Sequence, residues 1–537
     1  MSLDAIIISD TGYGFSKQSR SMGPPALKLE GRSATIQVLA NYLEHQGRIV
    51  PPIKDDGRLS WWSAPRYNGI FLLNHLLDNG FEVELINKYY EQRNDFLKLL
   101  EETPRVVIIS TTFIVSKQSL KELVNDIRSL APDIFIIVGG PFVYKSRLFL
   151  QRSQEELYVT GSEKEHFLFS QENEPSVDLY IIDRKGEEIL CEVMRRIKED
   201  LSINDIPNTA SFVDGKYHFT RLSDHVLKGI EAPVDWRSLP DHIFRSGVLP
   251  MQASSGCPYN CAFCNLIRSD SKIISIKPMD RIIEELKAVW SRGVQYVRFV
   301  DDNFRLGKPD LKEFCQHLLE ESVEIKWMMM TRVSTLKDVD AELLRRAGCL
   351  EVALGLESAD EQILLNMNKK ADLTTYRPVV RKLLAAGINC TCYFLFGFPG
   401  ETDDTALRTR DFIKSIEFPE LDGLLSWDLY TFFLSPLSPI YEVHMREKYG
   451  LTGFLDEWKH KTMDSQRAKE HIEAAYMELE NSCQLSRGDN LEILHSLSPH
   501  RQKEFSIKRY RLAKAARQNQ IRKEDILASF ENIIRKV

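Results

Sequence analysis

The sequence lacks the features by which a chain enters or crosses a membrane. Its 537 residues contain no run of about 18 uncharged apolar positions, so no transmembrane helix is expected. The N-terminus carries Asp4 and has neither a basic segment nor a cleavage site, which is unlike a signal peptide. A net charge of -7 at pH 7 gives no electrostatic reason to expect a nucleic acid as partner. We therefore expect a cytoplasmic protein with no membrane or nucleic-acid partner. The sequence does not define its oligomeric state.

Two common binding patterns are also missing. No Gly-x-Gly-x-x-Gly follows a predicted strand, and residues 10–15 are only superficially similar to it, so NAD binding is not expected. The nine cysteines show no disulfide-framework spacing, and their odd number suits buried free thiols in a reducing compartment. Six of them are scattered along the chain: Cys191, Cys315, Cys349, Cys390, Cys392 and Cys483.

The first part of the chain alternates strand-like and helical segments. The strand-like runs are residues 4–9, 81–87, 105–111, 134–140 and 177–183. Continuous β-branched runs are typical of strands buried on both faces of a parallel sheet. The pattern predicts a doubly wound, Rossmann-like α/β domain over residues 1–205, with ligands at the carboxyl ends of its strands. Residues 206–245 are expected to form a connector with a hairpin around Asp214 and Gly215.

A second alternation follows, and it contains six strand–helix units. After the first strand at 246–254, the predicted strands are residues 294–302, 323–332, 349–358, 388–400 and 423–433. Six units are too few for a closed eight-fold barrel, so we expect an open, partial barrel over residues 246–435. Residues 436–537 are expected to be mainly helical.

Three cysteines lie close together on the loop after the first strand of this second domain. Cys257, Cys261 and Cys264 form the pattern Cys-x3-Cys-x2-Cys, and no second pair follows nearby. Structural zinc usually takes four ligands, so a zinc site is a weaker alternative, as are unrelated thiols. Thiolates are the usual ligands of iron–sulfur clusters. Three of them would leave one iron of a [4Fe–4S] cluster without a protein ligand.

The cysteine motif in this position resembles the signature of radical S-adenosylmethionine (SAM) enzymes. The resemblance implies a [4Fe–4S] cluster whose open iron binds SAM, an external electron donor such as flavodoxin or ferredoxin, and cleavage of SAM to a 5′-deoxyadenosyl radical. It also implies SAM contacts at Phe263, directly before the third cysteine, and at later strand ends, although ordinary roles as rim residues or helix caps stay open for each. The expected contacts are Phe263, Asp301, Asp302, Arg332, Glu357, Ser358 and Gly397.

A doubly wound domain ahead of such a barrel resembles the cobalamin-binding class of these enzymes. The residues expected to line cobalamin are Ser110, Thr111, Thr112, Gly139, Gly140, Pro141 and Phe142. Many cobalamin domains carry Asp-x-His-x-x-Gly, whose histidine binds cobalt, but this chain has no such motif, and residues 223–229 have the wrong spacing. The resemblance therefore implies a cobalt without a protein histidine. Another nucleotide, or no ligand, is the alternative.

The domain order is similar to that of class B radical SAM methyltransferases, in particular the phosphinate P-methyltransferase type. The segments 139–142 and 462–464 carry this closer match. It implies methyl transfer through methylcobalamin to an unactivated carbon or a phosphinate phosphorus of a small-molecule or peptide natural-product precursor. Tyr430 is a candidate acid or base, with simple packing as the alternative. Two other functions stay open: an oxidation, ring rearrangement or cyclisation without methyl transfer, and a catalytically silent cluster-binding protein.

Overall fold

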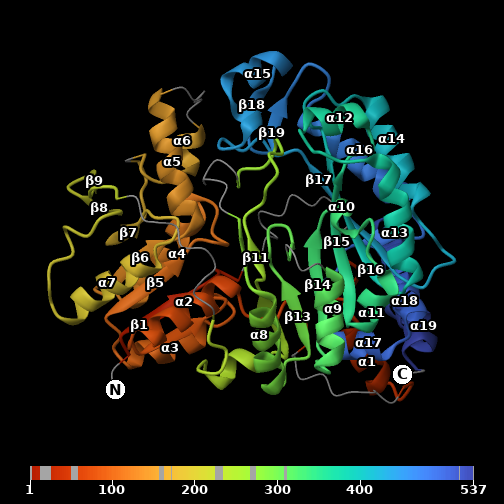
Figure 1. Cartoon of the computed structure of the whole chain (residues 1–537), viewed down its shortest axis with the longest axis horizontal. Helices are drawn as coiled ribbons and strands as arrows, with labels where there is room; N and C mark the ends of the chain where they lie inside the picture. Colours follow the sequence, from red (N-terminus) through yellow and green to blue (C-terminus); the bar gives the residue numbers. More distant parts are fainter. Residues whose placement is uncertain are drawn as a thin grey trace.

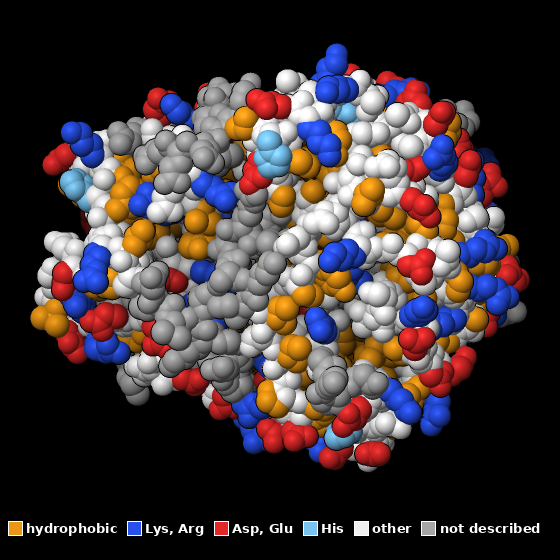
Figure 2. Space-filling model, turned by 45° about the horizontal axis from the view of Figure 1, so that its top comes forward, with side chains coloured by type: hydrophobic (Ala, Val, Ile, Leu, Met, Phe, Trp, Pro, Cys, Tyr) orange, Lys and Arg blue, Asp and Glu red, His pale blue; other side chains and the backbone are white. Residues whose placement is uncertain are grey.

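The computed structural model describes residues 3–12, 26–49, 59–155, 162–170, 172–223, 234–266, 274–306, 311–518 and 521–535. Two seven-stranded sheets, each with its own helices, lie side by side (Figure 1). Within the described ranges, no helix has the length and apolar character needed to cross a membrane. Figure 2 shows one face of the molecule, on which Lys and Arg side chains are interspersed with Asp and Glu.

The first sheet has the strand order β4-β1-β5-β6-β7-β8-β9. Its first five strands run parallel, and the β8–β9 hairpin adds two antiparallel strands. The strands are β1 (Ala5–Ile8), β4 (Val83–Ile86), β5 (Val106–Ser110), β6 (Phe135–Gly139), β7 (Leu179–Ile181), β8 (Thr209–Val213) and β9 (Lys216–Phe219). This is the doubly wound order expected from the sequence. The predicted hairpin is present, but it extends the sheet beyond residue 205.

Helices cover both faces of the first sheet. They are α2 (Tyr67–Asp78), α3 (Arg93–Glu101), α4 (Lys117–Leu130), α5 (Pro141–Glu155) and α7 (Glu187–Lys198). On β1, Ile7 packs into one hydrophobic cluster, whereas Ile6 and Ile8 pack into another on the opposite face. Both faces exclude water, which explains why these strands have continuous apolar sequences in place of an alternating pattern.

The second sheet is entirely parallel and follows the chain order β10-β13-β14-β15-β16-β17-β20. Its strands are β10 (Val248–Met251), β13 (Tyr296–Phe299), β14 (Lys326–Thr331), β15 (Cys349–Glu357), β16 (Asn389–Phe396), β17 (Leu425–Thr431) and β20 (Cys483–Gln484). The two end strands do not pair with each other, so the expected partial barrel is confirmed as an open one. The seventh strand, β20, comes from the region expected to be mainly helical.

Helices pack on the outer side of this sheet. The outer helices are α8 (Met279–Ser291), α9 (Leu311–Glu320), α11 (Ala341–Arg346), α13 (Tyr376–Ala385) and α14 (Asp403–Ser415). Val297 and Phe299 of β13 belong to the core beneath them, and Arg298 between them faces the other way. We call this other side of β13 to β17 the inner face. It carries Arg298, Met328, Glu351, Tyr393, Asp428 and Tyr430.

The C-terminal region forms a helical layer that also includes a segment from near the N-terminus. It contains α15 (Val443–Tyr449), α16 (Ser465–Glu478), α17 (Leu491–Ser496), α18 (Pro499–Gln518), α19 (Lys523–Ile534) and the hairpin of β18 (Thr452–Phe454) with β19 (Glu457–Lys459). Helix α1 (Ile36–His45) packs on α17 and α19 and not on the first sheet. The boundaries expected at residues 205, 245 and 435 stay predictions, because long-range pairing joins segments across them.

A buried ion pair fixes the connector against the second domain. Nζ of Lys277 lies 2.9 Å from Oε2 of Glu285, and the two side chains are only 2% and 3% exposed. The indole of Trp236, from the connector, donates to the same carboxylate over 3.2 Å. Removing one member of such a pair leaves an uncompensated charge inside the protein.

We therefore expect Glu285→Ala to lower the free energy of unfolding by about 3–5 kcal/mol, because Lys277 loses its buried counter-charge. Urea unfolding followed by circular dichroism measures this. Glu284→Ala is the matched control, since the neighbouring Glu284 is 61% exposed, and it should change stability by less than about 0.5 kcal/mol. Equal effects of the two substitutions would contradict the structural importance of the pair.

Candidate cofactor and substrate site

A buried carboxylate holds the start of the cysteine loop. Asp301, at the end of β13, is 2% exposed and accepts hydrogen bonds from the Ser254 hydroxyl at 2.6 Å and the Ala253 amide at 3.2 Å. Burial raises the pKa of Asp301 to about 6. Asp302 is exposed and accepts from the Gly256 amide at 3.0 Å. Both predicted SAM contacts therefore lie beside the loop, and Asp301 serves there as an anchor of the backbone.

The three cysteines are free thiols on one loop, with Cys261 buried and the other two partly exposed. The loop is fixed on two sides at Ala262, whose amide donates to the Met367 carbonyl at 2.7 Å and whose carbonyl accepts from the Ile440 amide at 3.0 Å. Burial raises the pKa of Cys257 and also that of Cys264, to about 11, and the nearby Cys261 adds to both shifts. The three sulfurs thus lie close enough to feel each other's charge.

This donor set suits a cluster better than a single ion. In the ranges that the structure describes, no group of three His, Cys, Asp or Glu side chains converges as the ligands of one metal ion would. Structural zinc usually takes four protein ligands, and only three cysteines lie on this loop. A [4Fe–4S] cluster takes one thiolate on each iron, so cysteines spread around a loop fit it. The residues that would hold it are Cys257, Cys261 and Cys264.

Arg332 directly follows β14, and Glu357 is the last residue of the neighbouring strand β15. Nη1 of Arg332 lies 3.8 Å from Sγ of Cys261, and its guanidinium stacks 3.8 Å from the ring centroid of Tyr259. Glu357 has a φ of 67°, an uncommon backbone conformation for a residue with a side chain, and its carboxylate pairs with Lys369 at 2.7 Å. A cavity of about 340 Å³ lies here, lined in part by Arg332 and Lys369. The structure thus brings Arg332 to the cysteine loop.

The remaining predicted SAM contacts are less accessible. Ser358 is fully buried, and its hydroxyl accepts from the Asp360 amide at 3.1 Å. Gly397 has a φ of 84°, and a Cβ there would lie 2.2 Å from the Trp458 ring. Phe263 is partly buried and packs edge-on against Phe398, with ring centroids 6.4 Å apart. Ser358 and Gly397 therefore serve local packing here, and their contact with SAM stays a prediction.

The predicted cobalamin residues gather at the carboxyl ends of β5 and β6. The hydroxyl of Thr111 donates to the Gly139 carbonyl at 2.8 Å and accepts from the Phe142 amide at 3.2 Å, which joins the two strand ends. Gly140 has a φ of 100°, and a Cβ there would come within 3.1 Å of the Thr111 amide nitrogen. Thr111 and Phe142 are buried and shape this edge, whereas Pro141 is exposed on it.

Ser110 and Thr112 complete this edge. The Ser110 hydroxyl accepts from the Asn68 amide group at 2.8 Å and lies 3.3 Å from the Thr112 hydroxyl. Oδ1 of Asn68 is buried and has no hydrogen-bond partner in the described ranges. A buried acceptor without a donor is costly and is consistent with a polar ligand at this edge.

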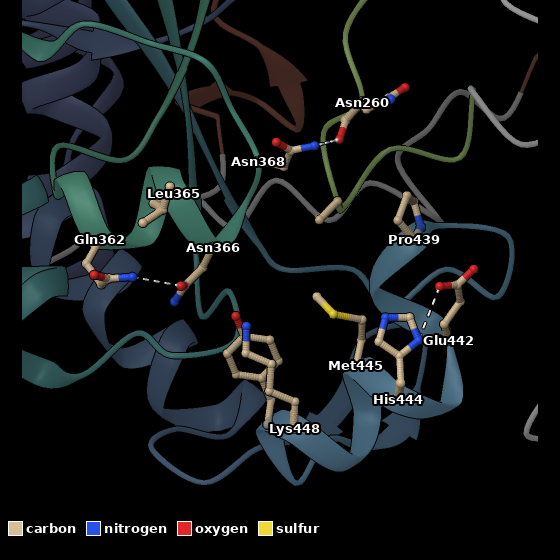
Figure 3. A pocket seen from close by; sticks show the side chains of 12 residues that line it. Asn260, Gln362, Leu365, Asn366, Asn368, Pro439, Glu442, His444, Met445 and Lys448 are labelled. Carbon is tan, nitrogen blue, oxygen red and sulfur yellow. Dashed lines mark hydrogen bonds and ion pairs between the residues drawn. The ribbon is translucent and has the colours of Figure 1, made fainter.

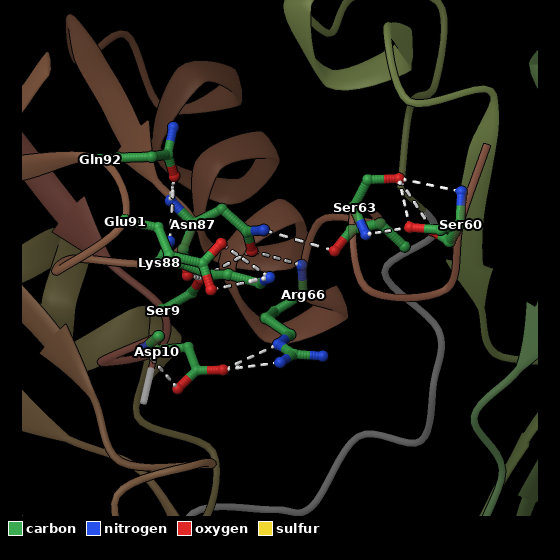
Figure 4. Close-up of polar contacts among 11 residues, drawn as sticks. Ser9, Asp10, Ser60, Ser63, Arg66, Asn87, Lys88, Glu91 and Gln92 are labelled. Atoms are coloured by element: carbon green, nitrogen blue, oxygen red, sulfur yellow. Dashed lines mark hydrogen bonds and ion pairs between the residues drawn. The ribbon is translucent and has the colours of Figure 1, made fainter. Parts of the chain in front are cut away.

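The sequence analysis missed a polar network at the ends of β1 and β4, shown in Figure 4. Asp10 lies just beyond β1, after Ser9, and pairs with Arg66 at 2.8 Å. Asn87, which follows β4, accepts from the Arg66 amide at 2.7 Å. The guanidinium of Arg66 also lies 4.7 Å from the ring centroid of Phe113. The rule that ligands bind at strand ends, applied to β1 as it was to β5 and β6, would have singled out Asp10.

The two domains touch beside the cysteine loop. Lys145, in the helix that follows β6, lies 3.4 Å from Oδ1 of Asn265, the residue after Cys264. The hydroxyl of Tyr441 donates to the buried carboxylate of Glu163 across the same junction. The strand ends of the first sheet therefore lie next to the loop that would hold the cluster.

Tyr430 lies on the inner face of the second sheet. Its hydroxyl donates to Asp428, and its ring centroid is 6.1 Å from that of Tyr393. Burial, with the charge of Asp428, raises the pKa of Tyr430. The phenol is therefore protonated at neutral pH, and a role for it as acid or base stays a prediction.

A second cavity, of about 390 Å³, adjoins the outer side of the cysteine loop (Figure 3). Its walls include Asn260 and Ala262, which flank Cys261, and Met445 and Lys448 of α15. The Asn260 carbonyl accepts from the Asn368 side chain at 2.7 Å, so this part of the loop is firmly held.

Comparison with known families agrees with this arrangement. Residues 251–413 match the Radical SAM superfamily, and residues 68–167 match the B12 binding domain. The chain thus carries a segment that matches a B12-binding domain ahead of one that matches a radical SAM domain, which is the domain order expected from the sequence. These two domains imply three cofactors: a [4Fe–4S] cluster, SAM and cobalamin.

Three curated relatives differ in their named activities. The chain is 21% identical to an uncharacterized methyltransferase of Pyrococcus horikoshii, over 65% of this chain and 73% of that protein. It is 24% identical to the anaerobic magnesium-protoporphyrin IX monomethyl ester cyclase of Cereibacter sphaeroides, over 60% of this chain and 55% of that protein. It is 32% identical to the bacteriochlorophyllide d C-12(1)-methyltransferase of Chlorobaculum tepidum, over 32% of this chain and 39% of that protein.

Two solved structures have the same overall fold. One is the radical SAM methyltransferase TsrM from Kitasatospora setae with cobalamin and [4Fe–4S] cluster bound, at 17% identity and a TM-score of 0.55, covering 83% of this chain and 75% of that one. The other is the cobalamin-dependent radical SAM enzyme OxsB, at 14% identity and a TM-score of 0.50, covering 99% of this chain and 71% of that one. At these identities the likeness establishes the fold alone.

The stability of the protein should depend on pH through one buried acid, Glu401, which contacts Gly397. Glu401 is fully buried, one carboxylate oxygen accepts from the Gly397 amide, and the other has no hydrogen-bond partner in the described ranges. Burial raises the pKa of Glu401 from 4.5 to about 8. Between these values the folded protein keeps a proton that the unfolded chain has released. Stability should therefore fall as pH rises through this window, by up to about 1.4 kcal/mol per pH unit.

We expect Glu401→Gln to remove this contribution, because the amide does not titrate. Urea unfolding at pH 5.5 and 7.5, compared between the variant and the unchanged protein, measures the difference. Glu361→Gln, at an exposed position of helix α12 (Glu361–Asn366), should retain the original pH dependence. An unchanged pH dependence in Glu401→Gln would show that Glu401 is ionised in the folded state.

Proposed function

We propose that this protein is a cobalamin-dependent radical SAM methyltransferase. It transfers a methyl group through cobalamin to an unactivated carbon or a phosphinate phosphorus of a small-molecule or peptide precursor of a natural product. An external electron donor such as flavodoxin or ferredoxin and a cytoplasmic location belong to the same proposal.

One contact carries this proposal. The 3.4 Å approach of Lys145 to Asn265 sets the strand ends of the B12-binding domain against the cysteine loop of the radical SAM domain. Methyl transfer needs the two cofactors to reach one substrate, and this junction is where both predicted sites meet. Two of the curated relatives are named methyltransferases, and TsrM has been solved with tryptophan substrate and a SAM analogue bound.

The chain's own residues bind and orient the reactants. When bound, the cluster and SAM supply radical chemistry and cobalamin supplies a transferable methyl group. We assign Arg332 to the SAM carboxylate, because a guanidinium forms charge-assisted hydrogen bonds to carboxylates. Gly140 and the hydroxyls of Ser110 and Thr112 hold the cobalamin side of the junction. The paired aromatic rings of Tyr393 and Tyr430 exclude water beside the substrate.

A second function has a specific observation in its favour. The cyclase of Cereibacter sphaeroides matches 60% of this chain, which is more than the 32% matched by the bacteriochlorophyllide methyltransferase. The alternative is therefore a radical reaction that closes or rearranges a ring without moving the methyl group of SAM.

Transfer of the methyl group of SAM to bound corrinoid separates the two functions without knowledge of the substrate. The protein is reconstituted anaerobically with the cluster, reduced cobalamin and SAM labelled in its methyl group, and passed through a gel-filtration column. We expect the corrinoid to elute with the protein and to carry the label. Corrinoid retained without label would favour the alternative, and no retained corrinoid would contradict cobalamin binding.

Gly140→Ala tests where the corrinoid binds. A Cβ at this position is strained by the φ of 100° and crowds the Thr111 backbone at 3.1 Å, so corrinoid affinity should fall roughly tenfold. Gly215→Ala is the matched control, because Gly215 has a φ of 76°, nothing within 4 Å of the added Cβ, and a place in the distant β8–β9 hairpin. Equal corrinoid retention in both variants would mean that cobalamin binds elsewhere.

Cys261→Ala tests the cluster. Loss of one of three thiolate ligands should lower the formation of 5′-deoxyadenosine from SAM under reducing conditions by at least about 100-fold. Cys191→Ala, at a buried cysteine of α7 in the other domain, should keep the rate within about twofold because it binds no iron. Iron analysis of the same samples distinguishes loss of the cluster from loss of SAM binding. Unchanged cleavage in Cys261→Ala would refute the assignment of the cluster ligands.

A further inference from the structure

The inner face of the second sheet is polar and open toward the strand ends. In closed barrels this side is filled by branched apolar side chains, whereas here it carries arginine, glutamate, aspartate and tyrosine. Val300 and Met330, which continue the inner-face alternation of β13 and β14, are 38% and 39% exposed. Apolar side chains exposed to this degree on the strands of a parallel sheet mean that solvent, or a ligand, reaches the inner face.

Arg487 extends over this face from a distant part of the chain. It follows β20, and its guanidinium nitrogens lie 3.8 Å from Sδ of Met328 and 3.4 Å from the hydroxyl of Tyr393. Met328 is on β14 and Tyr393 is on β16, so the guanidinium spans the strand between them. The loop that carries it is fixed by Asp489, whose carboxylate accepts from Arg509 at 2.6 Å. Arg487 is therefore positioned by the C-terminal layer.

Arg298 pairs in register with Met328, which Arg487 contacts, so the two arginines share this part of the inner face. In the described ranges the side chain of Arg298 forms no hydrogen bond, and neither guanidinium is in ion-pair contact with a carboxylate. Burial lowers the pKa of Arg298 to about 10, and the charge of Arg487 adds to this effect. The nearby carboxylates are engaged elsewhere: Glu351 accepts from Thr391 at 2.8 Å, and Asp428 accepts from Tyr430. Two like charges are thus held together with no carboxylate in contact, although the charge of the nearby Glu351 favours the charged form of both and helps to raise the pKa of Arg487.

We infer that Arg298 and Arg487 bind an oxyanion group of the substrate, a carboxylate or a phosphinate, on the inner face of the radical SAM domain. A guanidinium presents a planar fork of donors that matches such groups in a bidentate manner. The bound oxyanion neutralises the repulsion between the arginines. The rings of Tyr393 and Tyr430 flank the site, so the rest of the ligand carries a flat or apolar part. This inference rests on the proposed function, because it gives that reaction an anionic substrate class.

The site also lies toward the first domain. The positive charge of Arg66, from the network at the ends of β1 and β4, contributes to the lowered pKa of Arg298. Arg66 already has Asp10 as its partner at 2.8 Å, so it is not free to bind the ligand. A substrate held by Arg298 and Arg487 would therefore lie between the two domains, where both cofactors are expected.

The test is an equilibrium binding measurement by calorimetry in phosphate-free buffer. The protein is reconstituted with the cluster, cobalamin and saturating SAM, so that the cofactor sites are filled. The probes are benzoate, phenylphosphinate and the neutral benzamide, which share one ring and differ in charge and oxyanion type. We expect at least one oxyanion to bind at least tenfold more tightly than benzamide, and the tighter of the two identifies the acid type.

Substitution of either arginine should abolish this preference. Arg298→Gln and Arg487→Gln should each weaken oxyanion binding at least tenfold and leave benzamide binding unchanged. Arg237→Gln, at an exposed arginine of the connector, is the matched control and should bind all probes as the unchanged protein does. If Arg487→Gln fails to fold, as judged by its thermal midpoint and iron content, Arg298→Gln alone decides the outcome.

Equal binding of benzamide and both oxyanions, or unchanged oxyanion binding in Arg298→Gln, would overturn the inference. These outcomes are independent of methyl transfer. A protein that labels its corrinoid but shows no oxyanion preference would refute the substrate class alone. A protein with arginine-dependent oxyanion binding that transfers no label would refute the methyltransferase proposal alone.

Discussion

The arrangement of the site depends on one buried carboxylate, that of Asp301. It receives the backbone amides of Ala253 and Ser254, where the chain leaves β10, and so determines where the cysteine loop begins. Further along, the backbone of Ala262 bonds to Met367 on one side and Ile440 on the other. The loop is therefore held by hydrogen bonds at its start and between Cys261 and Cys264, before any cluster is considered. Ligands that are already in place lose less conformational entropy when the cluster binds.

The second constraint is that both sheets direct their carboxyl strand ends toward the same junction. A parallel sheet binds ligands at those ends, because its loops and helix N-termini gather there. Lys145 and Asn265 connect the two edges, and the Glu163–Tyr441 hydrogen bond closes the junction further. A polar inner face lacks the stabilisation that packed apolar side chains would give, but it can bind a charged molecule.

Local sequence patterns predicted the elements well, but not how distant elements pair. The runs 105–111 and 134–140 became β5 and β6, because continuous apolar residues specify a strand buried on both faces. The sequence could not show that β20 joins the second sheet or that α1 packs with the C-terminal helices, because both depend on contacts between distant segments. In the pair Asp301–Asp302, no local rule tells which carboxylate is buried. Arg298 lies in a predicted strand, but nothing in the local sequence marks it as a binding residue, because Arg487 lies far away in the sequence.

The structure uses different parts of the chain for cofactors and for substrate. The cofactor edges consist largely of backbone groups, short loops and glycines, whose geometry follows from the fold and is tolerant of changes elsewhere. The inner face is defined by the side chains of single strand positions, each of which can change without altering the sheet. A fold shared with TsrM at 17% identity is therefore compatible with a different substrate. In this chain the inner face brings together Arg298 and Arg487, with the nearby Glu351 as their shared negative charge and no carboxylate in contact with either guanidinium, and this is the basis of the anionic substrate that we infer.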